Sequence, residues 1–202
     1  MNNNVQIRLA TPDDAPEILA IYYPYILDTA VTFEEEVPSL DEFRQRINSI
    51  LEECPFLVCE IGGQLAGYAY AGPYRTRASY RWNKEVSVYV HDAFQRKQVA
   101  RALYLALFEL LARQHVANLL AVITLPNEGS VRLHEQMGFK PCGVFNRVGF
   151  KLGQWHSVGW WELSLPEADK SNPAELIPFG TFRENHSLDE IFQKAASLVK
   201  IS

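Results

Sequence analysis

The sequence predicts an α+β fold built on a mixed sheet in which most neighbouring strands are antiparallel. Short apolar segments typical of strands recur along the chain, and two of them are joined by Gly62-Gly63, a pair typical of hairpins. Other strands are separated by segments with apolar residues at spacings of three and four, as in amphipathic helices. Hairpin-like runs flank a central strand–helix–strand unit, so the sheet is expected to be mixed.

The first predicted elements are a strand and a capped helix. Residues 5–10 have the pattern of a short strand. Thr11 is expected to cap the following helix, with Pro12 at its first position. The apolar face of that helix is predicted to comprise Ile18, Leu19, Tyr22, Tyr25 and Ile26. A polar, acidic loop over residues 28–39 follows it.

A second helix and a hairpin come next. Ser39 with Glu42 has the spacing of a capping box, which marks a helix start. The apolar face of this helix is predicted to comprise Phe43, Ile47, Ile50 and Leu51. The hairpin strands are expected at residues 56–61 and 65–71, and a loop rich in aromatic and basic residues continues over residues 72–84.

The central strand begins at Glu85 and leads into the longest predicted helix. Alternating valines over residues 86–90 predict the strand, and residues 95–97 are expected to open the helix. Its apolar stripe comprises Val99, Ala102, Leu103, Ala106, Leu107, Leu110 and Leu111. A helix start offers unpaired N–H groups and the positive end of the helix dipole, which suit an anion such as a pyrophosphate. Basic residues there are also common as solvated surface, and they oppose the dipole.

The remaining elements alternate between strands and helices. Strands are predicted at residues 119–125, near 143–150 and near 158–165, with a helix over residues 127–136. Residues 166–180 have the composition of a linker, and Ser187 with Glu190 is predicted to cap a short helix bearing Leu188, Ile191, Ala195 and Leu198. We therefore expect one domain over residues 1–165 and an appended segment over residues 166–202 that folds on the domain or on a partner subunit.

The composition excludes several classes of function. The 202 residues are 48% hydrophobic and carry a net charge of −5, which suits one globular domain and argues against general nucleic-acid binding. No apolar run approaches the roughly 20 residues that span a bilayer, and the polar N-terminus lacks the pattern of a targeting signal, so a cytoplasmic protein is expected. Cys54, Cys59 and Cys142 are expected to be reduced, and neither they nor the histidines have metal-ligand spacing, so no metal site is predicted.

Several motifs in sequence order resemble the GNAT superfamily of N-acetyltransferases. VSVYVHDAFQRKQVARAL and NEGSVRLHEQMGF match its pattern of a strand, a Q/R-x-x-G-x-G/A turn and a later helix that begins with Asn and ends in Gly-Phe. TAVTFEEE, YAGPYRTRASYRW, VITLPNEGSVRLHEQMGF and GFKLGQWHSVGWWEL resemble more narrowly the phosphinothricin and methionine sulfoximine or sulfone acetyltransferases. The resemblance covers residues 7–165 and implies a mostly antiparallel mixed sheet with helices on both faces.

The resemblance implies acetyl-CoA as the acyl donor. Backbone groups of Val88, Tyr89 and Val90 would hold its pantetheine arm. Its pyrophosphate would bind to Arg96, Lys97, Gln98, Val99, Ala100 and Arg101. Asn127 and Ser130 would face the CoA arm, and Asn127 is at the same time a typical helix cap.

One departure from the family concerns the pyrophosphate turn. The family usually has glycine at the positions of Arg96 and Gln98, and here only Ala100 fits its small-residue alternative. With helical dihedrals, a non-glycine residue still presents its N–H, so Gln98 is expected to narrow the groove or weaken cofactor binding rather than abolish it. Arg96 is expected to compensate through phosphate contacts of its own.

Two residues are candidates for proton transfer. The resemblance implies that Glu85 accepts the proton of the amine, directly or through water, whereas a strand-end glutamate is otherwise commonly just solvated. His134 matches a position where the wider family carries a tyrosine acid and the phosphinothricin group carries histidine. It would shuttle a proton as a neutral imidazole or protonate the leaving sulfur as an imidazolium; the alternative is a structural histidine bonded to a carbonyl.

The substrate pocket is expected around two arginines. A pair of guanidinium groups suits a compact oxyanion such as a phosphinate, a sulfone, a sulfoximine or a carboxylate, although neighbouring arginines are also ordinary surface residues. The residues implied for substrate binding are Phe33, Glu35, Arg75, Arg77, Tyr80, Tyr104 and Trp160. Core packing is the alternative for Tyr104. In this family a second subunit commonly completes the pocket wall, which implies a homodimer.

Two other functions stay open at this point. One is acetylation of a different amine, such as a polyamine or a peptide N-terminus; the cationic arginine pair argues against polyamines. The other is an acyl-CoA-binding sensor with weak catalysis, suggested by the missing glycines at Arg96 and Gln98. The presence of both Glu85 and His134 argues against the sensor.

Overall fold

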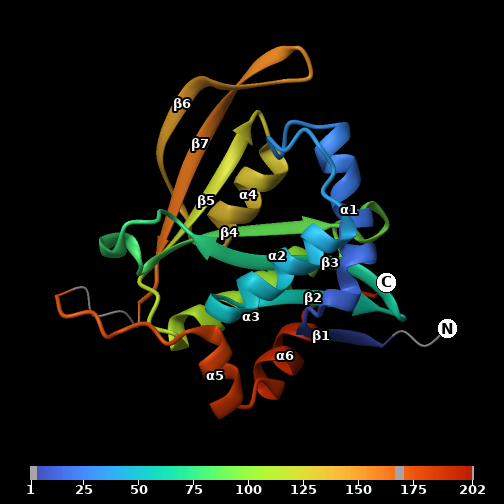
Figure 1. The fold of residues 1–202 in the computed structure, drawn as a ribbon. Coiled ribbons are helices and arrows are strands. Elements are labelled where there is room, and N and C mark those ends of the chain that lie inside the picture. Colours follow the sequence, from blue (N-terminus) through green and yellow to red (C-terminus); the bar gives the residue numbers. More distant parts are fainter. Residues whose placement is uncertain (1–3, 167–170, 202) are drawn as a thin grey trace.

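A single mixed sheet organises the molecule. The computed structural model describes residues 4–166 and 171–201, and in this part seven strands pair in the order β1-β2-β3-β4-β5-β7-β6 (Figure 1). They are β1 Val5–Leu9, β2 Phe56–Ile61, β3 Gln64–Pro73, β4 Asn83–Val90, β5 Asn118–Leu125, β6 Lys140–Lys151 and β7 Gln154–Ser164. Neighbouring strands are antiparallel except β4 and β5, which are parallel. The predicted α+β class with a mixed sheet is confirmed.

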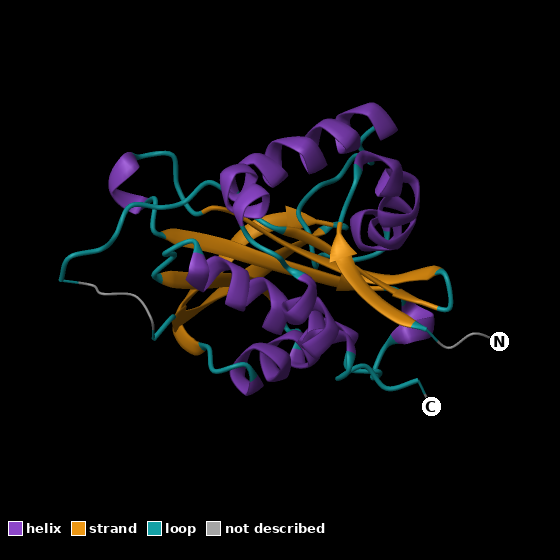
Figure 2. Ribbon diagram, turned by 90° about the horizontal axis from the view of Figure 1, so that it is seen from below, coloured by secondary structure: helices purple, strands orange, loops and turns teal. Residues whose placement is uncertain are grey.

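Helices cover both faces of the sheet (Figure 2). They are α1 Ala15–Leu27, α2 Leu40–Glu53, α3 Val99–Arg113, α4 Glu128–Gln136, α5 Phe179–Asn185 and α6 Asp189–Ala196. Tyr89 and Val90 are adjacent on β4, so their side chains point to opposite faces. The ring of Tyr89 packs on Tyr22 of α1 with centroids 4.9 Å apart. Val90 pairs with Gly67, where an added Cβ would lie 3.1 Å from Val99 of α3, so the glycine lets α3 approach the opposite face.

Local side chains determine where two of the helices begin. The Ser39 hydroxyl accepts a hydrogen bond from the Glu42 backbone N–H, and the Glu42 carboxylate accepts one from the Ser39 backbone N–H at 2.8 Å, so the predicted capping box forms. Asn127 caps α4 by accepting from the Ser130 N–H at 3.1 Å. Before α1, residues 12–14 form a short 3₁₀ turn, so α1 begins at Ala15 and not at the predicted proline.

The C-terminal segment differs from the sequence prediction in two respects. Helix α5 begins inside residues 166–180, which were predicted as linker, and its Phe179 and Phe182 are buried. Burial against α2, not local propensity, explains this helix. The predicted capping box of Ser187 with Glu190 is wrong, because the Ser187 hydroxyl faces the N–H two residues later and α6 has no side-chain cap. Helix α6 packs on β1 and α3.

The parallel step between β4 and β5 is short. Residues 83–85 of β4 pair with residues 118–120 of β5, and the register ends there. Beyond Glu85 the edge of β4 that faces β5 is available to partners outside the sheet. Between residues 4–166 and 171–201, none of the helices is long and apolar enough to span a membrane.

Candidate active site

The turn before α3 is not the helical start that the sequence predicts. Residues 95–97 were expected to open the helix, but α3 begins at Val99. Arg96 and Gln98 have φ angles of 62° and 67°, in the left-handed region that glycine adopts at least cost. The expectation of helical dihedrals at these two residues is therefore wrong, because both lie in the turn between the 3₁₀ turn at residues 92–94 and α3. The structure thus shows why glycine is suited to both positions.

This turn carries positive charge at an uncapped helix start. Arg96 and Arg101 are exposed, and within residues 4–166 and 171–201 neither forms an ion pair with a carboxylate. Gln98 precedes α3 and makes no side-chain capping hydrogen bond. The ammonium of Lys97 lies 5.7 Å from the centroid of the Phe94 ring. The free N–H groups of the first helical turn and the guanidinium groups together suit an anion.

The backbone N–H and C=O groups of successive β4 residues point alternately toward β3 and toward β5. The N–H of His91 donates to the carbonyl of Ala66 on the β3 side, so the backbone groups of Tyr89 face β3 as well. Those of Val88 and Val90 face the opening toward β5. The Val90 carbonyl accepts a hydrogen bond from the Tyr25 hydroxyl at 2.9 Å. Of the three residues expected to hold the pantetheine arm, Val88 and Val90 present their backbone groups to the opening, whereas Tyr89 does not.

Glu85 lies where the parallel pairing of β4 and β5 ends. Its side chain is partly buried, and burial raises its pKa, while the positive charge of Arg75 opposes the shift. The predicted base and the first predicted substrate arginine therefore interact. Strand β4 begins two residues earlier than predicted, so Glu85 lies inside it, and a carboxylate with a raised pKa is a suitable proton acceptor for an amine.

Aromatic rings surround Arg75. Its guanidinium carbon lies 5.0 Å from the ring centroid of Tyr74 and 5.9 Å from that of Tyr80. Tyr74 also packs edge-on against Trp160 of β7, with centroids 5.8 Å apart. The structure thus brings three predicted substrate residues together, Arg75, Tyr80 and Trp160. Arg77 is exposed and lines a shallow surface hollow with Arg75.

His134 belongs to a buried hydrogen-bonded chain. Its Nδ1 lies 2.8 Å from the backbone carbonyl of Ser130, and its Nε2 lies 3.0 Å from the hydroxyl of Tyr104. A carbonyl only accepts, so Nδ1 carries the proton and Nε2 accepts from the tyrosine. Burial lowers the pKa of His134, against the opposing effect of the Ser130 carbonyl, and so favours the neutral ring. Tyr104 is also buried, so it lies beside His134 and not on an open wall.

The acidic loop between α1 and α2 is fastened to the β6–β7 hairpin. The ammonium of Lys151, at the end of β6, donates to the Thr32 carbonyl at 2.7 Å. The ring of Phe33 occupies the space where a side chain at Gly149 would lie, which explains the glycine at that position. The negative charge of Glu35 acts on the same Lys151 ammonium. The two predicted residues Phe33 and Glu35 therefore lie against the hairpin.

Several residues near Glu85 were missed by the sequence reasoning. The charges of Arg46, Glu34 and Glu85 all act on the Tyr70 hydroxyl, and burial raises the pKa of that tyrosine. Arg46 and Glu34 form an ion pair at 2.9 Å. Tyr70 pairs with Ser87, which lies two residues from Glu85 and shares its face of β4. In the sequence, the alternation of strand residues could have placed Ser87 on the same face as Glu85. The register between β4 and β3 was needed to find Tyr70.

The part of the chain that the structure describes contains no group of three or more His, Cys, Asp or Glu side chains arranged to hold a metal ion.

Comparison with known proteins assigns the family. Residues 7–160 match the family model described as an acetyltransferase (GNAT) domain, so the chain belongs to the GNAT acetyltransferase family. The chain is 38% identical to a phosphinothricin N-acetyltransferase of Streptomyces viridochromogenes, over 78% of this chain and 86% of that protein. It is 33% identical to the L-methionine sulfoximine/L-methionine sulfone acetyltransferase of Salmonella typhimurium, over 80% of this chain and 95% of that protein.

A solved structure gives the same result for the fold. The crystal structure of a GNAT superfamily phosphinothricin acetyltransferase from Sinorhizobium meliloti, in complex with acetyl-CoA, superimposes with a TM-score of 0.82 at 30% identity. The match covers 89% of this chain and 98% of that one. The expected family and the sheet with helices on both faces are confirmed.

Proposed function

We propose that this protein transfers the acetyl group of acetyl-CoA to the α-amino group of a phosphinothricin-like amino acid, such as phosphinothricin, methionine sulfoximine or methionine sulfone. The main support for this proposal is Glu85. Its carboxylate has a raised pKa, and the positive charge of Arg75, which packs on aromatic rings, acts on it. Relatives with more than 30% identity act on these compounds according to their names. Each of the compounds joins an α-amino group to a compact polar group that accepts hydrogen bonds from a guanidinium.

The residues present fit acetyl-CoA as the acyl donor. Val88 offers a backbone donor and acceptor along the edge of β4 and Val90 a backbone donor, since the Val90 carbonyl already accepts from Tyr25; an extended pantetheine arm requires such groups. The diphosphate would bind to positive groups at the start of α3, namely Arg96, Arg101 and the first N–H groups of the helix. When bound, acetyl-CoA supplies a thioester carbonyl that an amine attacks. Asn127 is proposed to face the CoA arm with Ser130 while it caps α4.

Glu85 is proposed to make the amine nucleophilic. The α-amino group of an amino acid is protonated near neutral pH and must lose a proton before it forms a bond to carbon. A carboxylate whose pKa is raised by burial accepts that proton more readily than an ordinary surface glutamate. Arg75 and Arg77 are proposed to bind the polar end of the substrate, with Phe33, Glu35, Tyr80 and Trp160 forming the walls.

Of the two reaction roles open for His134, the neutral one fits better. An imidazolium would need a proton on Nε2, which accepts from Tyr104 and lies in a buried site. We therefore assign His134 as a neutral group that holds and exchanges the Tyr104 hydroxyl proton. Replacing His134 by Phe is expected to reduce turnover less than replacing Glu85 by Gln.

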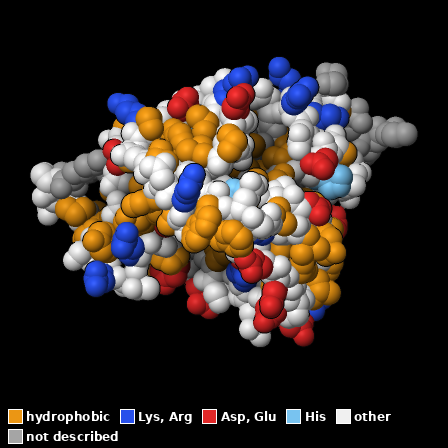
Figure 3. All heavy atoms as spheres, turned by 90° about the horizontal axis from the view of Figure 1, so that it is seen from above, with side chains coloured by type: hydrophobic (Ala, Val, Ile, Leu, Met, Phe, Trp, Pro, Cys, Tyr) orange, Lys and Arg blue, Asp and Glu red, His pale blue; other side chains and the backbone are white. Residues whose placement is uncertain are grey.

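The protein is further proposed to work as a homodimer through the β6–β7 hairpin, which projects from the sheet (Figure 1). Large apolar side chains are exposed along it: Val144, Phe145, Val148, Phe150, Leu152 and Trp155. On the end of the molecule to which the hairpin points, hydrophobic side chains form broad patches between charged ones (Figure 3). Light scattering after size exclusion is expected to give the mass of two chains, and Phe145→Glu should shift it toward one.

We also propose which part of the chain carries the reaction and where in the cell the protein is located. Residues 1–165 would carry the reaction, with residues 166–202 as an appended segment. A cytoplasmic location agrees with the free thiols of Cys54, Cys59 and Cys142.

Thiol release from acetyl-CoA with a panel of amines tests the proposed reaction. Turnover on phosphinothricin, methionine sulfoximine and methionine sulfone is the expected result, with far slower turnover on polyamines and peptide N-termini. Turnover on peptides alone would assign the other amine class. Acetyl-CoA binding without turnover on any amine would support the sensor and contradict the proposal.

A further inference from the structure

The C-terminal end of the chain reaches the turn before α3. The backbone N–H of Lys200 donates to the carbonyl of Lys97 at 2.9 Å, although the two residues are about a hundred positions apart in sequence. Lys97 lies between Arg96 and Gln98, the two residues with left-handed φ angles. One hydrogen bond therefore connects the stretch after α6 to the centre of the candidate diphosphate site.

The appended segment is firmly placed where it delivers this N–H. Ile191 and Ala195 of α6 are buried against the domain, and Val199, next to the donor, is 8% exposed. Helix α6 ends at Ala196, and the N–H of Val199 donates to the Ala196 carbonyl at 3.2 Å, which closes one turn after the helix. The apolar residues of α6 thus fix the position from which Lys200 reaches the turn.

The turn needs such support because of its backbone conformation. Each L-residue held in the left-handed region costs about 1 kcal/mol or more, and such residues persist when the surroundings determine them. Here two of three consecutive residues are in that region, and neither is glycine. A hydrogen bond to the Lys97 carbonyl opposes rotation of the peptide unit that joins Lys97 to Gln98, and so restrains the backbone between the two left-handed residues.

We propose that Val199 and Lys200 form a positioning element that holds residues 96–98 in the conformation that binds the diphosphate of acetyl-CoA. In this role the appended segment supplies the conformational restraint that two non-glycine residues require. The inference rests on the proposed function of the turn. Residues 161–202 lie outside the family match, so this restraint comes from a part of the chain beyond the common domain match.

A matched pair of substitutions isolates the hydrogen bond. Lys200→Pro removes the N–H donor together with the side-chain charge, whereas Lys200→Ala removes the charge and keeps the donor. Acetyl-CoA binding to the full-length proteins is measured by calorimetry, with thermal unfolding as a check on folding. A net hydrogen bond of about 1 kcal/mol corresponds to roughly a 5-fold weaker Kd for Lys200→Pro than for Lys200→Ala. Equal Kd values for the two variants would overturn the proposal.

The same substitutions in a Gln98→Gly variant test whether the restraint compensates for the missing glycine. Gln98→Gly relieves the left-handed cost, so Lys200→Pro is expected to weaken binding less in this background than in the parent. An undiminished effect of Lys200→Pro on Kd would contradict the link to the turn conformation. If Lys200→Pro lowers the unfolding temperature, a chain ending at Val199 replaces it, because it keeps the buried valine and lacks the donor.

The same titrations separate this inference from the proposed function. A parent protein that binds no acetyl-CoA would overturn both. A parent that binds, with indistinguishable Lys200→Pro and Lys200→Ala variants, would leave the proposed function in place and overturn the positioning role alone.

Discussion

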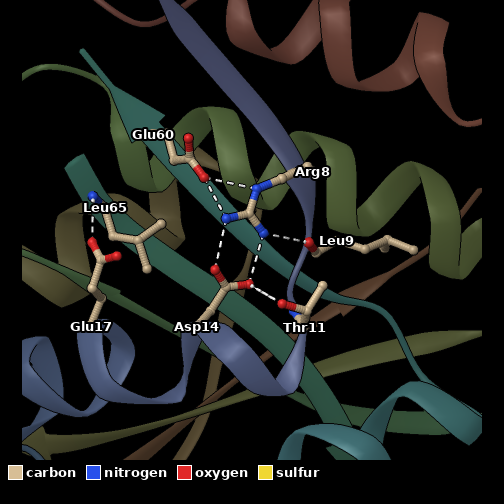
Figure 4. A network of polar contacts seen from close by, with 7 residues as sticks. All are labelled: Arg8, Leu9, Thr11, Asp14, Glu17, Glu60 and Leu65. Atoms are coloured by element: carbon tan, nitrogen blue, oxygen red, sulfur yellow. Dashed lines mark hydrogen bonds and ion pairs between the residues drawn. The ribbon is translucent and has the colours of Figure 1, made fainter. Parts of the chain in front are cut away.

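The Arg8 cluster and the turn before α3 handle charge in opposite ways. In the cluster, the Arg8 guanidinium donates to both oxygens of Asp14 at 2.7 Å and to Glu60, and Asp14 also accepts from the Thr11 N–H (Figure 4). Burial alone would raise the pKa of Asp14, but these hydrogen bonds and the Arg8 charge outweigh it and lower the pKa. The cluster joins β1, the start of α1 and β2, and each charge in it has a protein partner.

The turn and the neighbouring opening leave their charged groups to a ligand. Across residues 4–166 and 171–201, Arg77, Arg96 and Arg101 form no ion pair with a carboxylate, and α3 starts without a side-chain cap. The Arg8 cluster therefore has the charge pairing of a structural element, whereas the turn before α3 leaves its positive groups free to bind an anion. Substitutions in the cluster should therefore reduce stability, and substitutions at the opening should reduce activity or binding.

The largest expected effect is on catalysis. Glu85→Gln keeps the shape of the side chain and removes the proton acceptor, so turnover is expected to fall about 10²- to 10⁴-fold. Its unfolding temperature should stay close to that of the parent. Thiol release at saturating acetyl-CoA measures this, and near-parental turnover would show that Glu85 is not the base.

Breaking the Arg8 cluster should cost stability instead. Because Arg8 and Asp14 are mostly buried but not fully, Arg8→Met is expected to lower the free energy of unfolding by about 1–3 kcal/mol. Arg44→Met is the control, since its pair with Asp41 is exposed and worth about 0.5 kcal/mol. Urea unfolding measures both, and acetyl-CoA affinity should be unchanged.

The cluster also predicts a dependence of stability on pH. The lowered pKa of Asp14 means that its ionised form stabilises the fold above the ordinary aspartate value of about 4. This contribution is lost as pH falls through the lowered pKa. The stability difference between the parent and Asp14→Asn should therefore shrink between pH 7 and pH 3. A difference that stays constant over this range would contradict the assignment.

A capped helix start should respond differently from the uncapped one. Ser39→Ala removes the capping hydroxyl of α2 and is expected to lower the free energy of unfolding by about 1 kcal/mol. Acetyl-CoA affinity should not change. If calorimetry shows weaker binding for Ser39→Ala, the separation between structural and ligand-binding helix starts fails.

The smallest expected effect is on the pH dependence of kcat/KM at acidic pH. Arg75 opposes the raised pKa of Glu85, so its removal should raise that pKa further. In Arg75→Met, the fall of kcat/KM with decreasing pH is therefore expected to begin at higher pH than in the parent. Arg81→Met is the control, because Arg81 stacks on Trp82 and pairs with Glu175. An unshifted profile would show that Arg75 does not act on the base.

Local patterns predicted the elements that local interactions determine. The capping box at Ser39, the Asn127 cap and the hairpin at Gly62-Gly63 follow from neighbours in sequence, and the structure contains all three. Helix α5 was missed because its stability comes from the burial of Phe179 against α2, which no local pattern encodes.

Site residues that belong to sequence motifs could be predicted. Residues whose position depends on strand register or on backbone dihedral angles could not. The family motifs indicated Glu85, Arg75 and His134. The chain turns at Arg96 and Gln98 through left-handed conformations that their side chains do not favour, so residue type alone indicated a helix. The proximity of Tyr70 and the bond from Lys200 depend on strand register and on the path of the tail.

Titration of acetyl-CoA into the parent protein and into an Arg96→Ala/Arg101→Ala variant tests the central claim most directly. We expect saturable heat for the parent, an affinity that falls as salt is raised, and clearly weaker binding by the variant. Absence of heat in the parent, or equal affinity in the two proteins, would contradict the account of this turn as the diphosphate site.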